Sequence, residues 1–164
     1  MSNNMSQLKG KETIDQGNRV EIIRRMFEQV EIDFRHLVGS IEPMPFPQVD
    51  LRLEFKSQPG LPFPVVATLQ GDELGLGAGE GFWCEWFPCG DSEVRERFAD
   101  AVRGVLSGQH RIVEYRRRER IVKAQLQRKA AKGWETFATW SLARFPLMFG
   151  LKMSTLQNLS LTQG

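Results

Sequence analysis

Phe82-Trp83-Cys84-Glu85-Trp86-Phe87 is a run of six residues that contains four large aromatic side chains. Aromatic residues favour β-strands, and successive side chains of a strand point to opposite faces. The alternation gives two sets: Phe82, Cys84 and Trp86 on one face, and Trp83, Glu85 and Phe87 on the other. One set can fill a core. The other needs a helix, a partner or a ligand over it, because soluble domains rarely expose a broad aromatic patch.

Three further strands are predicted before this run. Apolar and charged residues alternate over residues 49–56, which is typical of a strand with one buried and one solvated face. A Pro-Gly turn follows, and then come two more strands, Pro64–Gln70 and Glu73–Ala78, separated by Gly71. With the aromatic strand at Gly81–Phe87, the pattern predicts a four-stranded antiparallel meander, which a proline-rich connector at Ile41–Pro47 precedes.

Two amphipathic helices flank the meander. The first has Asn18 as its cap and ends at Gly39, and the second has Asp91 or Ser92 as its cap and ends at Gly108. Their apolar residues recur at steps of three and four, the period of one helix face. These are Val20, Ile23, Phe27, Val30, Phe34 and Leu37 in the first helix and Val94, Phe98, Ala101, Val102, Val105 and Leu106 in the second.

The residues after Gly108 allow two interpretations. Strand-forming residues at 111–117 and 120–127 predict a hairpin, although no Gly, Pro or Asn marks a turn between them. Residues 116–132 also have the composition of a helix. A strand is predicted at 134–140, and the apolar C-terminal segment predicts a helix from about Leu151.

These elements predict an α+β fold in the order helix, four strands, helix, two or three strands and an apolar C-terminal segment. We expect the helices mainly on one face of an antiparallel sheet, because each has one apolar stripe to bury. We expect residues 1–17 to form a disordered polar tail and residues 18–164 a single domain. Over residues 18–150 the order of elements is similar to that of the small type III secretion chaperones. The resemblance implies a chaperone-like architecture, and no functional residue is carried over from it.

The composition is that of an ordinary globular protein. Of the 164 residues, 41% are hydrophobic and 26% are charged. The sequence contains no apolar run of roughly 18 residues and no leader-like segment, so we expect a soluble cytoplasmic protein without membrane insertion. Its two cysteines, Cys84 and Cys89, are then expected to be free thiols.

The spacing of reactive residues matches no metal or nucleophilic site. The two cysteines lie five residues apart, and neither His36 nor His110 belongs to a zinc-binding pattern. We therefore expect no metal, no cofactor and no catalytic residue. One alternative stays open: Glu85 lies between aromatic residues on one strand face, and such a setting suits a carboxyl group for acid–base work in a small-ligand pocket or an enzyme.

Charge is distributed unevenly along the chain. Residues 1–90 carry 8 Lys and Arg against 13 Asp and Glu, and residues 91–164 carry 14 against 7. Attraction between the two halves is the favoured explanation. The alternative is single-stranded nucleic-acid binding by residues 111–132, which carry nine basic and two acidic residues. A hairpin there is expected to place three arginines along one solvated face, with two rings as stacking platforms. The candidate residues are Arg116, Arg118, Arg120, Tyr115 and Trp134.

The leading hypothesis is a non-enzymatic protein-binding or assembly module, acting as a homodimer or with another protein. Trp83, Phe87 and Trp134 are the candidate contact residues, together with Glu85 and the C-terminal segment, because exposed aromatic residues supply much of the energy of protein interfaces. The same rings can instead belong to the core under the helices.

Overall fold

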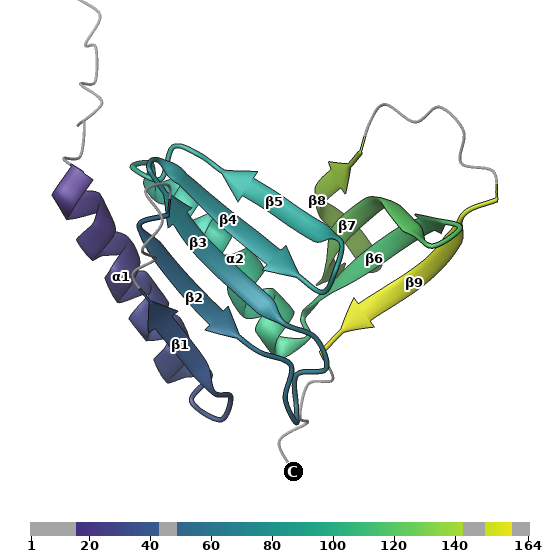
Figure 1. Ribbon diagram of the computed structural model, residues 1–164, viewed down its shortest axis with the longest axis horizontal. Helices are drawn as coiled ribbons and strands as arrows, with labels where there is room; N and C mark the ends of the chain where they lie inside the picture. The colour runs from purple at the N-terminus through teal and green to yellow at the C-terminus, as the bar shows by residue number, and fades with distance from the viewer. Residues whose placement is uncertain (1–15, 43–48, 143–149, 159–164) are drawn as a thin grey trace, which may run out of the picture.

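The computed structural model describes residues 16–42, 49–142 and 150–158, which form two helices and nine strands (Figure 1). In chain order the elements are α1 (Gln16–Asp33), β1 (Gly39–Glu42), β2 (Leu51–Phe55), β3 (Val65–Gln70), β4 (Glu73–Ala78), β5 (Phe82–Trp86), α2 (Ser92–Ser107), β6 (His110–Arg117), β7 (Arg120–Ala130), β8 (Gly133–Ser141) and β9 (Lys152–Gln157).

The strands form two antiparallel sheets. The first has the order β1-β2-β3-β4-β5 and the second the order β8-β7-β6-β9. The predicted α+β class, the antiparallel meander and the order of elements are confirmed. The meander has five strands rather than four, and the strands after α2 form a sheet of their own that stands at an angle beside β5 (Figure 1).

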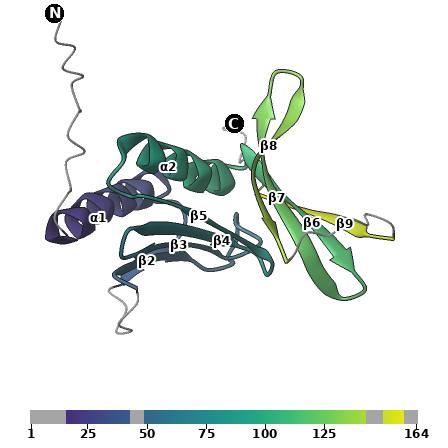
Figure 2. The same cartoon turned by 90° about the horizontal axis from the view of Figure 1, so that it is seen from above.

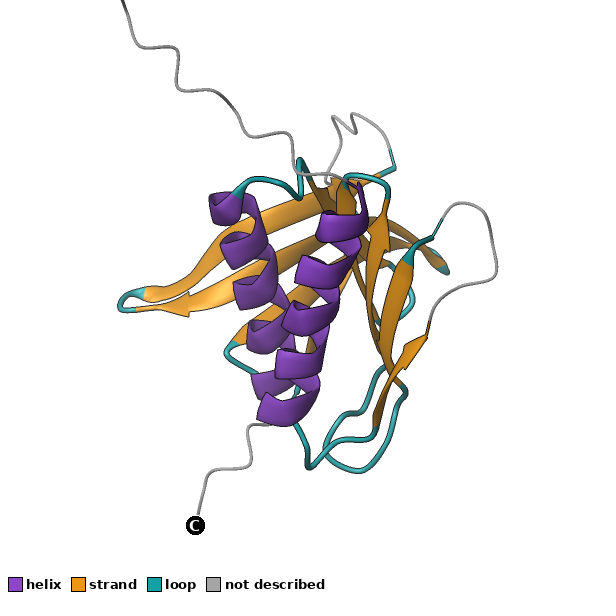
Figure 3. Ribbon diagram, turned by 90° about the vertical axis from the view of Figure 1, so that its left-hand side faces the viewer, coloured by secondary structure: helices purple, strands orange, loops and turns teal. Residues whose placement is uncertain are grey.

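Both helices lie on one face of the five-stranded sheet (Figure 2), where they run side by side (Figure 3). The alternating residues Leu51, Leu53 and Phe55 of β2 are buried in the core beneath them. Phe98 of α2 is fully buried, and its ring centroid lies 6.4 Å from that of Phe27 in α1 and 5.6 Å from that of Trp86 in β5. These three rings join the two helices to the sheet.

The ends of α1 differ from the prediction. The helix begins at Gln16 instead of at an Asn18 cap, and it ends at Asp33. Phe34 and Leu37 are buried as expected, but they belong to tight turns after the helix, in which the Leu37 amide donates to the Phe34 carbonyl at 2.7 Å. The chain then enters β1 at Gly39, the residue expected to end the helix. Residues 39–42 pair with β2, so β1 also includes Ile41 and Glu42 of the predicted connector.

The limits of α2 agree with its sequence signals. The Asp91 carboxylate accepts from the Glu93 amide, and Gly108 ends the helix with a φ of 74°. The hairpin interpretation of the next residues is confirmed, since β6 pairs with β7. Arg118 makes the turn with a φ of 55°, so a residue other than Gly or Asn adopts the left-handed conformation there.

The predicted C-terminal helix is wrong. Residues 152–157 form β9, which pairs with β6 along its free edge. Pairing satisfies the backbone of that edge, and Leu156 packs against the core while Asn158 donates to the Leu106 carbonyl of α2. Most of the expected N-terminal tail, part of the predicted connector and part of the apolar C-terminal segment lie outside the described residues, but Gln16 and Gly17 belong to α1.

Candidate functional site

The face of the five-stranded sheet that points away from α1 and α2 is called the open face below. Within the described part of the chain no helix covers it (Figure 2). The cross-strand register places eight residues of strands β2–β5 on it: Arg52, Glu54, Val66, Thr68, Gly75, Gly77, Trp83 and Glu85.

Trp83 is the largest side chain of the open face, and two glycines of β4 leave room for its ring; this glycine surface is called the seat of Trp83 below. Its indole ring lies over Gly75 and Gly77 of β4, where a Cβ atom would collide with the ring. The indole Nε1–H donates to Glu85 Oε1 at 2.9 Å. Thr68 lies under the same ring edge and is buried. Two glycines and one hydrogen bond therefore fix the orientation of a ring that stays 38% exposed.

The alternation predicted for the aromatic strand is confirmed. Phe82 and Trp86 are buried among the helices, whereas Trp83 is exposed and Phe87, one residue past β5, is 70% exposed. The strand therefore uses one aromatic face for the core and leaves the other without cover in the described structure.

A groove of about 410 Å³ lies where the open face meets the second sheet. Trp83 of β5, Trp140 of β8 and the turn residues Gly79–Gly81 are among the residues that line it. Arg52 also lines the groove and is paired with Glu54 at 2.9 Å. The lining of the groove thus combines two tryptophan rings with an arginine that is held in an ion pair.

Glu85 lies on the open face, but it is not among the residues that line the groove. Its side chain accepts from Trp83, and no second titratable side chain within the described residues is hydrogen-bonded to it. General acid–base catalysis needs a positioned partner or substrate group within hydrogen-bond reach. In this arrangement the Glu85 carboxylate orients the Trp83 ring through a hydrogen bond.

The three arginines predicted to share one face are separated. Arg116 pairs with Ile121 in the register, whereas Arg120 pairs with Arg117, so the two lie on opposite faces of the hairpin. Arg116 points to the junction between the sheets, where it contacts Glu114 at 2.9 Å and Glu80 at 3.6 Å. The hydrogen bond that Arg116 donates to Glu114 raises the pKa of the guanidinium, and Arg116 serves as the counter-charge of this buried carboxylate. Arg118 lies in the turn.

Tyr115 and Trp134 are brought together with basic residues that the sequence did not single out. The guanidinium carbon of Arg111 lies 4.2 Å from the centroid of a Trp134 ring, and Lys123 Nζ lies 5.2 Å from the Tyr115 ring. Side-chain alternation could have predicted this grouping. Arg111 and Tyr115 are an even number of positions apart on β6 and share one face, whereas Arg116 lies on the other face. The alignment of residues across strands could not be predicted in the same way, because two β-bulges in β6–β8 shift the register.

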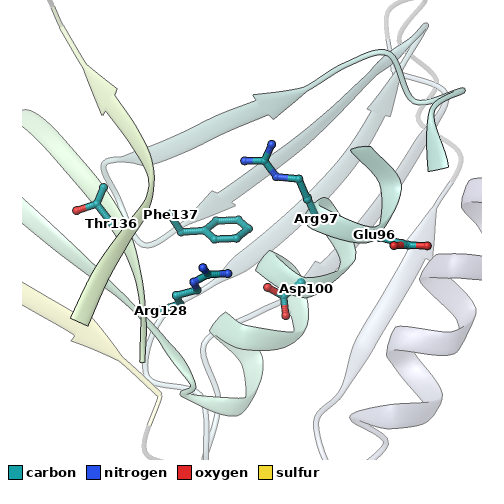
Figure 4. A pocket seen from close by; sticks show the side chains of 6 residues that line it. All are labelled: Glu96, Arg97, Asp100, Arg128, Thr136 and Phe137. Atoms are coloured by element: carbon teal, nitrogen blue, oxygen red, sulfur yellow. The ribbon is translucent and has the colours of Figure 1, made fainter. Parts of the chain in front are cut away.

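A second pocket, of about 540 Å³, lies between α2 and β7–β8 and was not predicted (Figure 4). The guanidinium groups of Arg97 and Arg128 lie 5.8 Å and 5.7 Å from the Phe137 ring centroid. Behind this ring lies His110, which is 5% exposed, and burial lowers the pKa of its imidazole. Glu96 and Asp100 also line the pocket, so both signs of charge are mixed within it.

The two cysteines are free thiols in different surroundings. Cys84 is partly buried, and burial raises its pKa. Cys89 is buried beside Asp72, which accepts hydrogen bonds from the Cys89 amide at 3.1 Å and from its Sγ at 3.2 Å. Burial and this carboxylate raise the pKa of Cys89 to about 11. No cluster of three or more His, Cys, Asp and Glu with the geometry of a metal site occurs among the described residues.

We expect the raised pKa of Cys89 to make the protein less stable in alkali. Between about pH 9, where the thiol ordinarily titrates, and about pH 11, the unfolded chain releases a proton that the folded protein retains. The free energy of unfolding should therefore fall as the pH rises through this window, by up to about 3 kcal/mol. Urea unfolding at intervals from pH 8 to 11 measures the fall. The Cys89→Ala variant should lose this part of the pH dependence, and parallel curves for the two proteins would contradict the assignment.

In comparisons with known proteins, no protein-family model, no curated protein and no solved structure matched the chain. The similarity of element order to the secretion chaperones thus stays a prediction. The described helices include none with the length and apolar character needed to cross a bilayer.

Proposed function

We propose that this chain is a non-enzymatic protein-binding module whose open face receives a second copy of the chain or another protein. The observation that carries the proposal is the seat of Trp83. A ring held by Gly75, Gly77 and Glu85 loses little conformational entropy on binding, and such preorganisation is what strengthens an interface residue. Tryptophan is among the residues that contribute most at protein interfaces.

The surroundings of Trp83 also favour a protein partner. Phe87 offers a second, more exposed ring at the end of the same strand. The groove beside Trp83 is lined by Trp83 and Trp140 and also by Arg52, which pairs with Glu54. An apolar centre with a polar rim is the usual anatomy of a protein interface. We propose a homodimer as the first assembly to test, in the reducing environment of the cytoplasm, where Cys84 and Cys89 stay free thiols.

Three variants test the proposal. Trp83→Ala deletes the ring, Phe87→Ala deletes its neighbour, and Gly75→Ala displaces the Trp83 ring without deleting it. We expect Trp83→Ala to weaken self-association or capture of a protein partner by about 2 kcal/mol, roughly 30-fold. Sedimentation velocity over a concentration series measures self-association, and pull-down from nuclease-treated lysate followed by titration with the purified partner measures hetero-association.

Val38→Ala is the matched control. Val38 is exposed and apolar, like Phe87, but it lies in the turn before β1 and away from the open face. It should leave association unchanged. The proposal fails if Trp83→Ala and Phe87→Ala keep full association, or if both lose their folded circular-dichroism signal, since the rings would then serve only the fold.

A further inference from the structure

The second sheet has a face that is basic and aromatic. Its register places Arg111 and Tyr115 of β6, Lys123 and Lys129 of β7, and Trp134 of β8 on the same side, away from the core residues Ile112, Ala124 and Leu126. These five residues define what is called the basic face below. The carboxylates of the described strands in this sheet, Glu114 and Glu135, alternate to the opposite side. The basic face therefore carries cations without strand carboxylates among them.

The cations of this face do not form ion pairs with carboxylates of the acidic residues 1–90 that the structure describes. Within the described residues, two ion pairs join a carboxylate before residue 90 to an arginine after it, Asp33 with Arg103 and Glu80 with Arg116. Arg111, Lys123 and Lys129 make no ion pair there. Attraction between the halves accounts for Arg116 but not for these three cations.

The rings and cations of the basic face are arranged as pairs. Arg111 stacks over Trp134, and its Nε also donates to Gln127 Oε1 at 3.0 Å. Lys123 lies over Tyr115, whose hydroxyl donates to Gln125 Oε1 at 2.9 Å. Each glutamine accepts through its carbonyl oxygen, so its NH₂ group is directed to donate to another acceptor. The sheet thus has two neighbouring units, Arg111–Trp134–Gln127 and Lys123–Tyr115–Gln125. Each unit contains an aromatic ring, a cation fixed beside it and an amide donor.

We propose that the basic face binds single-stranded nucleic acid. Lys123, Lys129 and Arg111 neutralise backbone phosphates, while bases stack on the Tyr115 ring and on the planar Arg111 guanidinium that Trp134 supports. Tyr115 lies four positions after Arg111 on β6, roughly 13 Å away at 3.3 Å per residue, so one short nucleic-acid strand can contact both units. The face of a four-stranded sheet reaches unpaired bases but not the edges of stacked base pairs, since major-groove recognition needs a helix or a two-stranded β-ribbon that enters the groove. The site is separate from the open face and does not depend on the proposed protein binding.

Fluorescence anisotropy with a fluorescein-labelled mixed-sequence 12-mer, as RNA and as DNA, tests the proposal on the full chain. Three phosphate contacts predict that log K falls with log salt at a slope of about −2, because each contact on a single strand contributes about −0.7. Lys123→Gln with Lys129→Gln should reduce the slope to about −0.7. The matched control, Arg35→Gln with Lys56→Gln, removes two exposed cations beside the first sheet and should leave slope and affinity unchanged.

Trp134→Ala should weaken binding about tenfold with an unchanged slope, since it removes stacking support and no charge. Circular dichroism confirms that each variant is folded, and Trp83→Ala should bind the 12-mer as the wild type does. Four results would overturn the proposal: no binding at 50 mM salt, equal affinity for a duplex of the same sequence, binding to phosphatidylserine vesicles but not to the 12-mer, or equal losses in the control and in Lys123→Gln with Lys129→Gln.

Discussion

The Phe98→Ala variant is expected to unfold with a free energy lower by about 3–5 kcal/mol. Phe98 is fully buried, and its ring contacts both Phe27 of α1 and Trp86 of β5. Truncation removes the transfer energy of the ring and leaves a cavity where both helices meet the sheet, which the rigid strands cannot close.

Urea unfolding followed by circular dichroism measures this loss. Ile32→Ala serves as the control, because Ile32 is an exposed apolar residue on the other helix and its truncation should change the free energy of unfolding by no more than about 0.5 kcal/mol. A loss below about 1 kcal/mol in Phe98→Ala would show that the three-ring contact does not hold the layers together.

The second large effect is expected at Gly104 of α2. The imidazole of His110 lies directly against this residue, and a Cβ atom at position 104 would overlap the ring. Gly104→Ala should therefore destabilise the fold by about 1–3 kcal/mol, although Ala is the better helix former by about 1 kcal/mol. The close approach of β6 to α2 explains why a glycine occupies a helix interior.

A double-mutant cycle separates the two contributions at Gly104. In a His110→Ala background the obstructing ring is gone, so the same substitution should become neutral or stabilising through helix propensity alone. Thermal and urea unfolding of the four proteins measure the coupling. If Gly104→Ala costs the same free energy with and without His110, the ring is not the cause of the penalty.

Much of the fold followed from local patterns. The alternation of Phe82–Phe87, the capped helix between Asp91 and Gly108, and the apolar residues of α1 each depend on neighbours within a few positions. β1 and β9 were missed because their strand character comes from the edges they join, which are distant in sequence. Propensity alone made the apolar C-terminal segment look helical, and tertiary pairing with β6 overrides that preference.

For the candidate sites, too, the exposed residues of a single strand were predictable from the sequence, whereas the contacts between strands were not. Trp83 and Phe87 follow directly from side-chain alternation, and the structure leaves both exposed. The glycine seat under Trp83 was not predicted, because Gly75 and Gly77 come from another strand and only the β4–β5 register aligns them with the ring. Alternation places Arg116 on the same face of β6 as Glu114, but it cannot show that this face packs against the first sheet, where Arg116 pairs with Glu114 and Glu80.

The pairing of β6 with β9 has a consequence for the order of folding. Arg111 of β6 lies opposite Gln157, 46 positions later, whereas the strands of the first sheet are joined to their neighbours by short connections. Contacts between distant positions form more slowly than local ones, and during synthesis β9 leaves the ribosome after β6 and the strands of the meander. The meander can thus assemble early while one side of β6 waits with unpaired amides and carbonyls, a state that invites pairing with other nascent chains.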